Sequence, residues 1–220
     1  MAMQTNLLLS AAELAAREIR DRIRAGDLKP GERISSDEIS QQLGISKTPV
    51  RDALQNLRQE GLVEIQARVG AFVRQITMRE IKEVYSLKSA VEPLAAAWAA
   101  EHGTLADRQR LSVAMTNLEL AAAEDNVDGG VESVDAIHDL IFDMADSEVM
   151  RDVYRVFRAR VRTLRQINLA QPGRLSVSAQ HHRKIVDAIC AGDPAAAAAM
   201  AEHLADATEA VKNVLTTDGD

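Results

Sequence analysis

The sequence has few aromatic residues and almost no cysteine. Aromatic side chains make up 3% of its 220 residues, and Cys190 is the single cysteine. One cysteine cannot form a disulfide framework within the chain, so we expect a cytoplasmic protein rather than a secreted, disulfide-stabilised module. The sequence also lacks an apolar run near the about 20 residues that a membrane-spanning helix needs. Its N-terminus lacks the basic start and the cleavage site of a signal peptide. We therefore expect no association with a membrane.

Alanine and leucine dominate what is present. Hydrophobic residues make up 46% of the chain, which is ample for a packed core, and the abundance of alanine and leucine favours helices over sandwiches or barrels. A chain of 220 residues exceeds the usual size of one domain. We predict a mainly α-helical protein with two domains, residues 1–76 and residues 77–220.

The negative charge of the chain is concentrated in its second part. The formal net charge is −7, which taken alone argues against binding to nucleic acid. Residues 1–78 hold 11 Lys and Arg against 10 Asp and Glu, whereas residues 79–220 hold 15 against 23. Binding to DNA depends on cations placed locally against phosphates rather than on the total charge. The nearly neutral first part therefore remains a candidate DNA-binding domain.

The first part of the chain predicts a particular order of elements. Apolar residues at helical spacing and capping residues indicate three helices, the last two joined by a tight glycine turn, and alternating apolar residues indicate two short strands around a turn. The predicted spans are 11–25, 36–43 and 47–60 for the helices and 62–65 and 71–73 for the strands. This order is typical of a winged helix-turn-helix domain.

Cationic and hydroxyl side chains gather at the start of the third predicted helix. Lys47, Thr48 and Arg51 occupy the end of the helix that meets base edges and phosphates when a recognition helix enters the major groove. The alternative is that these are ordinary solvated charges of a small module, which is the better interpretation for Arg58 alone. The residues that we expect to contact DNA, including those of the preceding turn and of the wing, are Arg33, Ser46, Lys47, Thr48, Arg51, Arg68 and Gly70.

The same segments resemble a known family. Residues 30–34, 43–54 and 60–63, with the wing at 68–73, are similar to the DNA-binding domain of GntR-family regulators. The resemblance implies a winged helix-turn-helix that binds an operator. This chain has Asp37 where the family often has an arginine that contacts DNA, so the resemblance implies a changed operator or one phosphate contact fewer.

From Met78 onward the sequence shows only helical patterns. The expected spans are 78–101, 104–125, 130–145, 147–169, 176–191 and 193–214, and one of the breaks between them falls at Gly129-Gly130. Pro93 should kink the first of these helices or split it in two, because proline lacks the backbone N–H of a helix interior. We predict an all-helical bundle as the second domain.

This second part resembles the all-helical sensor domain called FCD, of the fatty-acid-regulator-like subfamily. The resemblance rests on residues 85–95 and 182–204 and extends over about residues 78–215. It implies a domain that binds a small-molecule effector and forms a homodimer. Two DNA-binding domains in a symmetric dimer imply a pseudo-palindromic operator.

In many members of that subfamily an aspartate and three histidines hold a divalent metal. The sequence supplies Asp135, His138, His182 and His203 as the candidate ligands, which suit Zn, Ni or Mn. The family places its aspartate four residues before the first histidine, where this chain has Val134, and Asp135 lies three residues before it. His181 is an alternative to His182. The alternative for the whole set is that these are hydrogen-bonded histidines of the bundle core.

The effector implied by the resemblance is a carboxylate. Lys88 stands where the subfamily often has an arginine that holds an acidic effector. Arginines also recur along one predicted helix at residues 151, 155, 158, 162 and 165, a spacing typical of a solvated face or of salt bridges. One of them, Arg162, is a candidate for an anion-binding pocket. Lys88 and Arg162 are thus the candidate effector-binding residues.

Two functions are considered for this sequence. The first is a DNA-binding transcription regulator, a repressor whose affinity for its operator is controlled by a metabolite. The second is a metal-dependent enzyme built on the helical bundle, which would need an open metal position and a general base. The sequence shows no HExxH motif, nucleophile elbow or phosphate-binding loop. We therefore expect a regulator without enzymatic activity and without catalytic residues.

Overall fold

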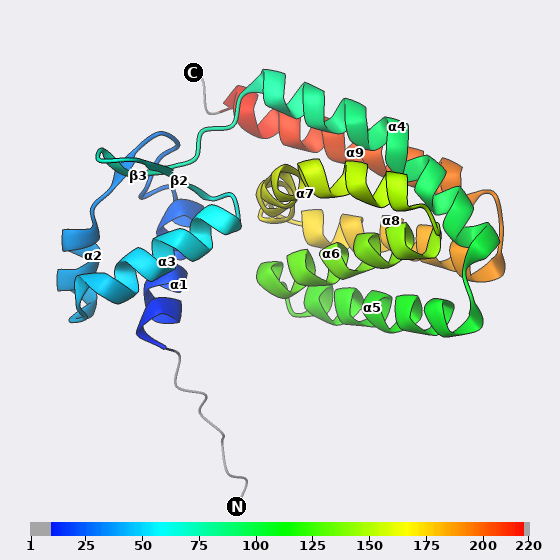
Figure 1. Cartoon of the computed structure of the whole chain (residues 1–220), viewed down its shortest axis with the longest axis horizontal. Coiled ribbons are helices and arrows are strands. Elements are labelled where there is room, and N and C mark those ends of the chain that lie inside the picture. The colour runs from blue at the N-terminus through cyan, green and yellow to red at the C-terminus, as the bar shows by residue number, and fades with distance from the viewer. Residues whose placement is uncertain (1–9, 218–220) are drawn as a thin grey trace, which may run out of the picture. The chain divides into compact units, whose positions relative to one another are not determined.

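The computed structural model describes residues 10–217, and the chain divides between Ile76 and Thr77 into two compact units. The first unit contains three helices and a small sheet, and the second is entirely helical in its described part (Figure 1). The predicted fold class, a winged helix-turn-helix followed by an all-helical bundle, is confirmed. Within the described range, no helix is both long and apolar enough to cross a membrane.

The first unit is built from short elements that are closed by local signals. Ser10 and Glu13 form a capping box at the start of its first helix, and Ser35 caps the second. The three strands form an antiparallel sheet in the order β1-β3-β2. The elements are α1 (Ala11–Ala25), β1 (Arg33–Ile34), α2 (Ser36–Leu43), α3 (Lys47–Gln59), β2 (Val63–Gln66) and β3 (Gly70–Val73).

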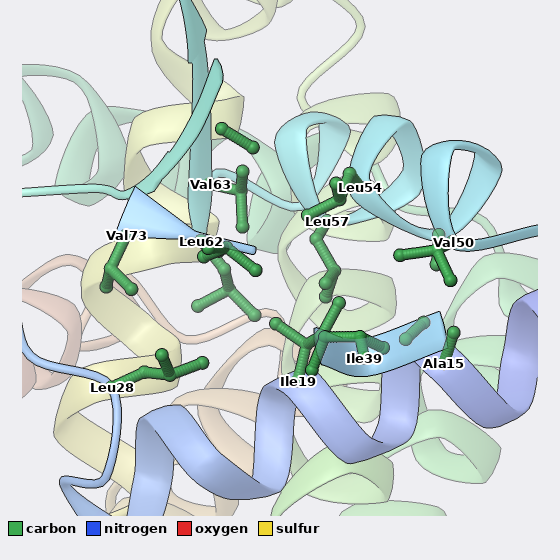
Figure 2. Packing of buried hydrophobic residues seen from close by; sticks show 14 residues of the cluster. Ala15, Ile19, Leu28, Ile39, Val50, Leu54, Leu57, Leu62, Val63 and Val73 are labelled. Atoms are coloured by element: carbon green, nitrogen blue, oxygen red, sulfur yellow. The ribbon is translucent and has the colours of Figure 1, made fainter. Parts of the chain in front are cut away.

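Apolar side chains from all three helices and the sheet meet in one core. Ile19 of α1, Ile39 of α2 and Leu57 of α3 are almost completely buried, and Val63 of β2 packs against the same cluster (Figure 2). Burying an aliphatic side chain of this size contributes about 1.5–3 kcal/mol. This core fixes the orientation of α3, whose opposite face is exposed.

Six long helices make up the described part of the second unit. Most begin at a side-chain cap, such as Thr77, Thr104 or Ser147, that accepts a hydrogen bond from the first turn. The packed pairs include α4 with α9, α5 with α6, and α8 with both α5 and α9 (Figure 1). The helices are α4 (Met78–His102), α5 (Leu105–Ala123), α6 (Val127–Met144), α7 (Glu148–Leu169), α8 (Arg174–Ala191) and α9 (Ala196–Thr217).

Two interruptions expected in this unit do not occur as helix breaks. Helix α4 runs unbroken through Pro93, so of the two expected outcomes, a kink or a split, the split does not occur. Gly129 and Gly130 lie inside α6, which begins at the Asn126 cap. Gly130 faces Leu175 of α8, and a Cβ at this position would overlap with the Leu175 side chain. The glycine thus leaves room for the Leu175 side chain and does not form a turn.

Candidate DNA-contacting surface and candidate metal site

Helix α3 exposes its polar start and buries its apolar face. Gly44 ends α2 in the left-handed region, with φ of 65°, and the chain turns at once into α3, whose N-cap is Ser46. Val50 and Leu54 face the core. The predicted DNA-contacting residues of this segment are all exposed: Ser46, Lys47, Thr48 and Arg51. The first-turn backbone N–H groups of a helix have no intrahelical acceptor, so this end can also bind a phosphate.

Lys47 has an acidic partner. Its Nζ lies 2.6 Å from Oδ1 of Asp37, in the first turn of α2, and the two side chains are 59% and 72% exposed. Asp37 is the residue at which the sequence departs from the family pattern. An ion pair this exposed is worth about 0–1 kcal/mol, so a phosphate can displace Asp37 from Lys47 at little cost.

The wing places Arg33 beside Gly70. Arg33 lies in β1 and pairs in register with Phe72 of β3. A Cβ at Gly70 would lie 3.0 Å from Nε of Arg33, so the lack of a side chain at Gly70 leaves room for this guanidinium. Arg68, in the turn between β2 and β3, is exposed and has a positive φ of 63°. The structure therefore brings the candidate Arg33 together with the wing residue Gly70.

Three histidines converge in the interior of the second unit. His138 of α6, His182 of α8 and His203 of α9 are 0%, 0% and 6% exposed. One potential ligand atom from each lies within 4.8 Å of the other two. The Nε2 atoms of His138 and His182 are 3.3 Å apart, near the about 3.4 Å between two nitrogens bound to one tetrahedral zinc.

Burial keeps these imidazoles neutral. Desolvation, with a smaller contribution from the Lys88 charge, lowers the pKa of His138 to about 3. Desolvation also lowers the pKa of His182 and of His203 well below the ordinary value. A histidine must be neutral to bind a metal. The cluster therefore presents neutral nitrogen donors that fit a divalent transition metal.

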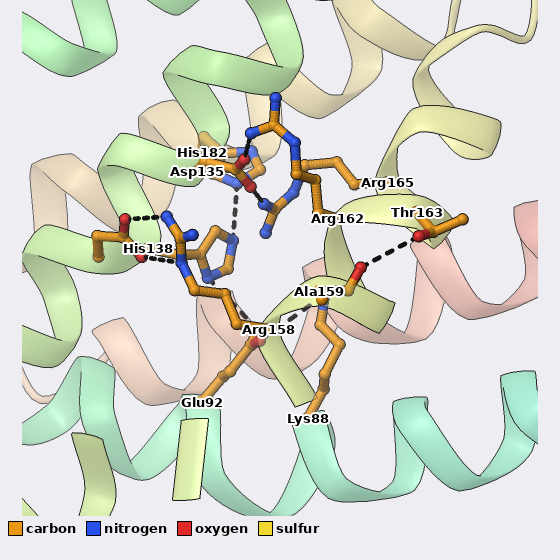
Figure 3. Close-up of polar contacts among 11 residues, drawn as sticks. Lys88, Glu92, Asp135, His138, Arg158, Ala159, Arg162, Thr163, Arg165 and His182 are labelled. Atoms are coloured by element: carbon orange, nitrogen blue, oxygen red, sulfur yellow. Dashed lines mark hydrogen bonds and ion pairs between the residues drawn. The ribbon is translucent and has the colours of Figure 1, made fainter. Parts of the chain in front are cut away.

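The structure does not bring the predicted fourth ligand into this cluster. Both oxygens of Asp135 are engaged, one by Arg162 and the other by Arg165 (Figure 3). In the described part of the chain, only the three histidines form a candidate metal-binding group. His181 is partly exposed, whereas its neighbour His182 faces His138, so the geometry favours His182 of the two.

The candidate effector-binding residues both have acidic partners. Lys88 is 5% exposed, and its Nζ lies 3.7 Å from Oε1 of Glu92, one turn further along α4. Burial lowers the pKa of Lys88 to about 8. Arg162 pairs with Asp135. Each arginine of the predicted stripe forms an ion pair, with Asp143, Asp152, Asp139, Asp135 and Asp135 in chain order.

One residue of this region, Glu92, is not among those predicted from the sequence. Glu92 is completely buried in α4, and its Oε2 lies 3.5 Å from Nδ1 of His138. Burial raises its pKa, while the charges of Lys88 and Arg165 oppose this shift. The spacing of Lys88 and Glu92, four residues apart in an apolar helix, was the available signal, because such a pair can be buried together.

Comparison with known proteins identifies the class and then the family. Residues 11–73 match the model described as "Bacterial regulatory proteins, gntR family", and residues 83–206 match the FCD domain. The class is that of transcription regulators with a winged helix-turn-helix, and the chain belongs to the GntR family and carries an FCD domain. It is a DNA-binding transcriptional regulator.

Curated relatives and solved structures agree with this assignment. The chain is 25% identical over 194 residues to the "HTH-type transcriptional repressor RspR" of Escherichia coli K12, covering 88% of this chain and 85% of that protein. It is 31% identical over 198 residues to the "Probable D-xylose utilization operon transcriptional repressor" of Paenarthrobacter nicotinovorans, covering 86% and 82%. A GntR transcriptional regulator from Rhodococcus sp. RHA1 has the same fold, with a TM-score of 0.61 at 24% identity, covering 93% and 99%.

Proposed function

We propose that the protein is a repressor that binds a pseudo-palindromic operator as a homodimer and responds to a small organic acid. The observation that carries this proposal is the exposed start of α3, where Lys47, Thr48 and Arg51 project from a helix whose other face is buried. Two similar proteins are named repressors, which supports the direction of regulation. The unit before Thr77 would bind DNA, and the unit after Ile76 would dimerise and sense.

The dimer would form through an apolar stripe on α7. Val149, Val153 and Val156 follow one another at spacings of four and three, and they are 76%, 40% and 77% exposed. A groove of about 450 Å³ beside them is lined by Val153, Val156 and residues of α4 such as Leu87. Acidic residues of α4 and Arg160 of α7 line the same groove. Under a two-fold axis, a surface that carries both charges and an apolar stripe is complementary to itself, so we propose a second copy as its occupant.

A divalent metal, with Zn, Ni or Mn as candidates, would be held by His138, His182 and His203. The support is their convergence, their neutrality and the 3.3 Å between two Nε2 atoms. When bound, such a metal supplies a coordination position for an oxygen of the effector. In this proposal Asp135 is not a ligand, because Arg162 and Arg165 already engage both of its oxygens.

The effector would be a carboxylate that competes with internal acids for the same cations. Lys88 and Arg162 are held by Glu92 and Asp135, and an acidic ligand that replaces either partner rearranges contacts among α4, α6 and α7. An effector regulates only if it binds the DNA-competent and DNA-incompetent states with different affinity. Exchange of ion-pair partners in the bundle supplies such a difference.

The proposal is tested by fluorescence anisotropy with the DNA upstream of the chain's own coding sequence. We expect binding that prefers this DNA over a scrambled duplex of equal length and that weakens steeply with salt, because phosphate contacts release counterions. A panel of small dicarboxylates and hydroxy acids should contain members that weaken the complex. Equal affinity for the scrambled duplex across salt concentrations would refute sequence-specific binding.

A further inference from the structure

We propose that Glu92 is a positioning residue for the candidate metal site: its carboxylate accepts a hydrogen bond from Nδ1–H of His138 and so directs the Nε2 lone pair of His138 toward the metal. The inference rests on the proposed metal site. Glu92 comes from α4, which supplies none of the three histidines, and it approaches His138 from the side opposite His182 (Figure 3).

The first step concerns the two nitrogens of His138. Its Nε2 lies 3.3 Å from Nε2 of His182, and its Nδ1 lies 3.5 Å from Oε2 of Glu92. A neutral imidazole carries one hydrogen, so the group beside one nitrogen decides which nitrogen keeps a lone pair. A carboxylate beside Nδ1 is an acceptor. The hydrogen therefore belongs on Nδ1, and Nε2 is left as a donor to a metal.

The second step is that His182 uses the same arrangement. Its Nδ1 lies 2.7 Å from the backbone oxygen of Ser178, one turn earlier in α8. A backbone carbonyl only accepts, so Nδ1 of His182 carries the hydrogen. The Nε2 atoms of His138 and His182 then face each other as two lone pairs, an arrangement that repels unless a cation lies between them. The acceptors behind these two imidazoles thus favour the same metal-binding tautomer.

The third step concerns the charge of Glu92. Its two oxygens face different partners, Oε1 toward Lys88 at 3.7 Å and Oε2 toward His138 at 3.5 Å. Among the described residues, neither oxygen has a hydrogen-bond partner within the structure, and Nδ1 of His138 has none either. Buried polar atoms of this kind normally pair. The charge of Lys88, beside Oε1, compensates the buried carboxylate of Glu92. The other oxygen, Oε2, faces His138, so His138 is the group that Glu92 orients.

The test must distinguish the orientation of His138 by Glu92 from the ion pair that Glu92 forms with Lys88. Removing Glu92 alone would leave Lys88 buried without a counter-charge, so both variants carry K88M. The double variants K88M/E92Q and K88M/E92L contain no buried charge at these positions, and they differ in whether an acceptor faces His138. Both full-length proteins are purified without metal, and circular dichroism verifies that they are folded.

Two readouts are measured, Zn²⁺ affinity by competition with a chromophoric chelator and the visible absorption spectrum of the Co²⁺ form. Loss of an outer-shell partner of a metal-bound histidine costs about 10–100-fold in metal affinity. We expect K88M/E92L to bind Zn²⁺ about tenfold or more weakly than K88M/E92Q and to show an altered Co²⁺ spectrum. The amide oxygen of K88M/E92Q can accept the same hydrogen bond, so this variant should stay close to wild type.

Each outcome decides between the two proposals. Equal Zn²⁺ affinities and equal Co²⁺ spectra for the two variants, in a wild-type background that binds metal, would overturn the role of Glu92 and leave the three-histidine site standing. A wild-type chain that binds neither ion would overturn the metal site and the role of Glu92 with it. Should K88M/E92L fail to fold, K88M/E92Q is compared with K88M/E92M, and equal spectra again refute the inference.

Discussion

At the scale of single residues, we predict that Asp37 weakens DNA binding by the candidate surface that its neighbours form. It holds Lys47 through an exposed ion pair of 2.6 Å. DNA phosphates must therefore displace Asp37, and its own negative charge then lies near the DNA. An arginine at this position, which the family often has, would instead add a cation. We therefore predict that Asp37 lowers the non-specific affinity for DNA without any change in the fold.

Replacing Asp37 by Asn should strengthen DNA binding. The change frees Lys47 and removes a negative charge, and an exposed pair is worth at most about 1 kcal/mol, or about fivefold in affinity. We expect D37N to bind the upstream DNA about two- to fivefold more tightly at low salt. The matched control is E38Q, which removes the neighbouring charge of the same helical turn. An equal gain for E38Q would attribute the effect to net charge rather than to the pair with Lys47.

Single substitutions distinguish which of the histidine and aspartate candidates bind the metal. H182A should lower Zn²⁺ affinity about 100-fold or more, because it removes a ligand. H181A is the matched control, since His181 is adjacent in sequence but partly exposed, and it should leave the affinity within about threefold. D135N should do the same if Asp135 pairs with Arg162 and Arg165 alone. A loss for D135N as large as that for H182A would restore Asp135 as a ligand.

At the scale of elements, we predict that the start of α3 contacts DNA and that its far end does not. Removing two cations from the start, in K47A/R51A, should weaken binding strongly and lower the salt slope by about one for each lost phosphate contact. Arg58 is an exposed residue in the last turn of the same helix. We expect R58A to bind DNA almost like wild type. An R58A defect equal to that of K47A/R51A would mean that another face of α3 contacts the DNA.

Sequence patterns predicted the helices well and their interruptions poorly. The spacing of apolar residues and the capping serines place α1, α2 and α3 close to their observed bounds. Pro93 was expected to kink or split its helix and the paired glycines to break theirs, yet α4 continues through Pro93 and α6 through Gly130. Tertiary packing overrides local propensity here, because Gly130 allows Leu175 to approach α6. The two-residue strand β1 was missed because its pairing with β3 defines it, not its own sequence.

The sequence predicted the histidines of the candidate metal site better than it predicted the contacts of the nearby carboxylates. Three histidines on three helices are a strong signal once helices are assigned, and their convergence is confirmed. Spacing alone allowed Asp135 to share a face with His138, but it could not reveal that Arg162 and Arg165 approach that carboxylate from α7. Glu92 was not predicted because its partner His138 lies on another helix, α6. The partners of a buried charge are set by neighbouring helices that are distant in sequence.

At the scale of the whole molecule, the proposed regulation depends on two copies acting together. The proposed dimer surface is the α7 stripe with its flanking groove on α4. Glutamates placed in the stripe, in V153E/V156E, would have to be buried against each other in the dimer, which is strongly unfavourable. We expect this variant to be a folded monomer by sedimentation. V113E/L120E is the matched control, because Val113 and Leu120 are exposed apolar residues of α5 outside the groove, and it should remain a dimer.

The monomeric variant also tests whether dimerisation, DNA binding and metal binding depend on different parts of the chain. Linking two DNA-binding domains makes the second contact intramolecular, and this raises affinity by about 10²–10⁴-fold without a new contact. V153E/V156E should therefore lose about 100-fold or more in affinity for a full operator while keeping the affinity for a half-site. Its Zn²⁺ affinity should not change, since the three histidines come from α6, α8 and α9 of one chain. If the variant lost both Zn²⁺ affinity and DNA affinity, the substitutions would have damaged the bundle itself. If it lost only affinity for the full operator, dimerisation would belong to the surface of the bundle and metal binding to its interior.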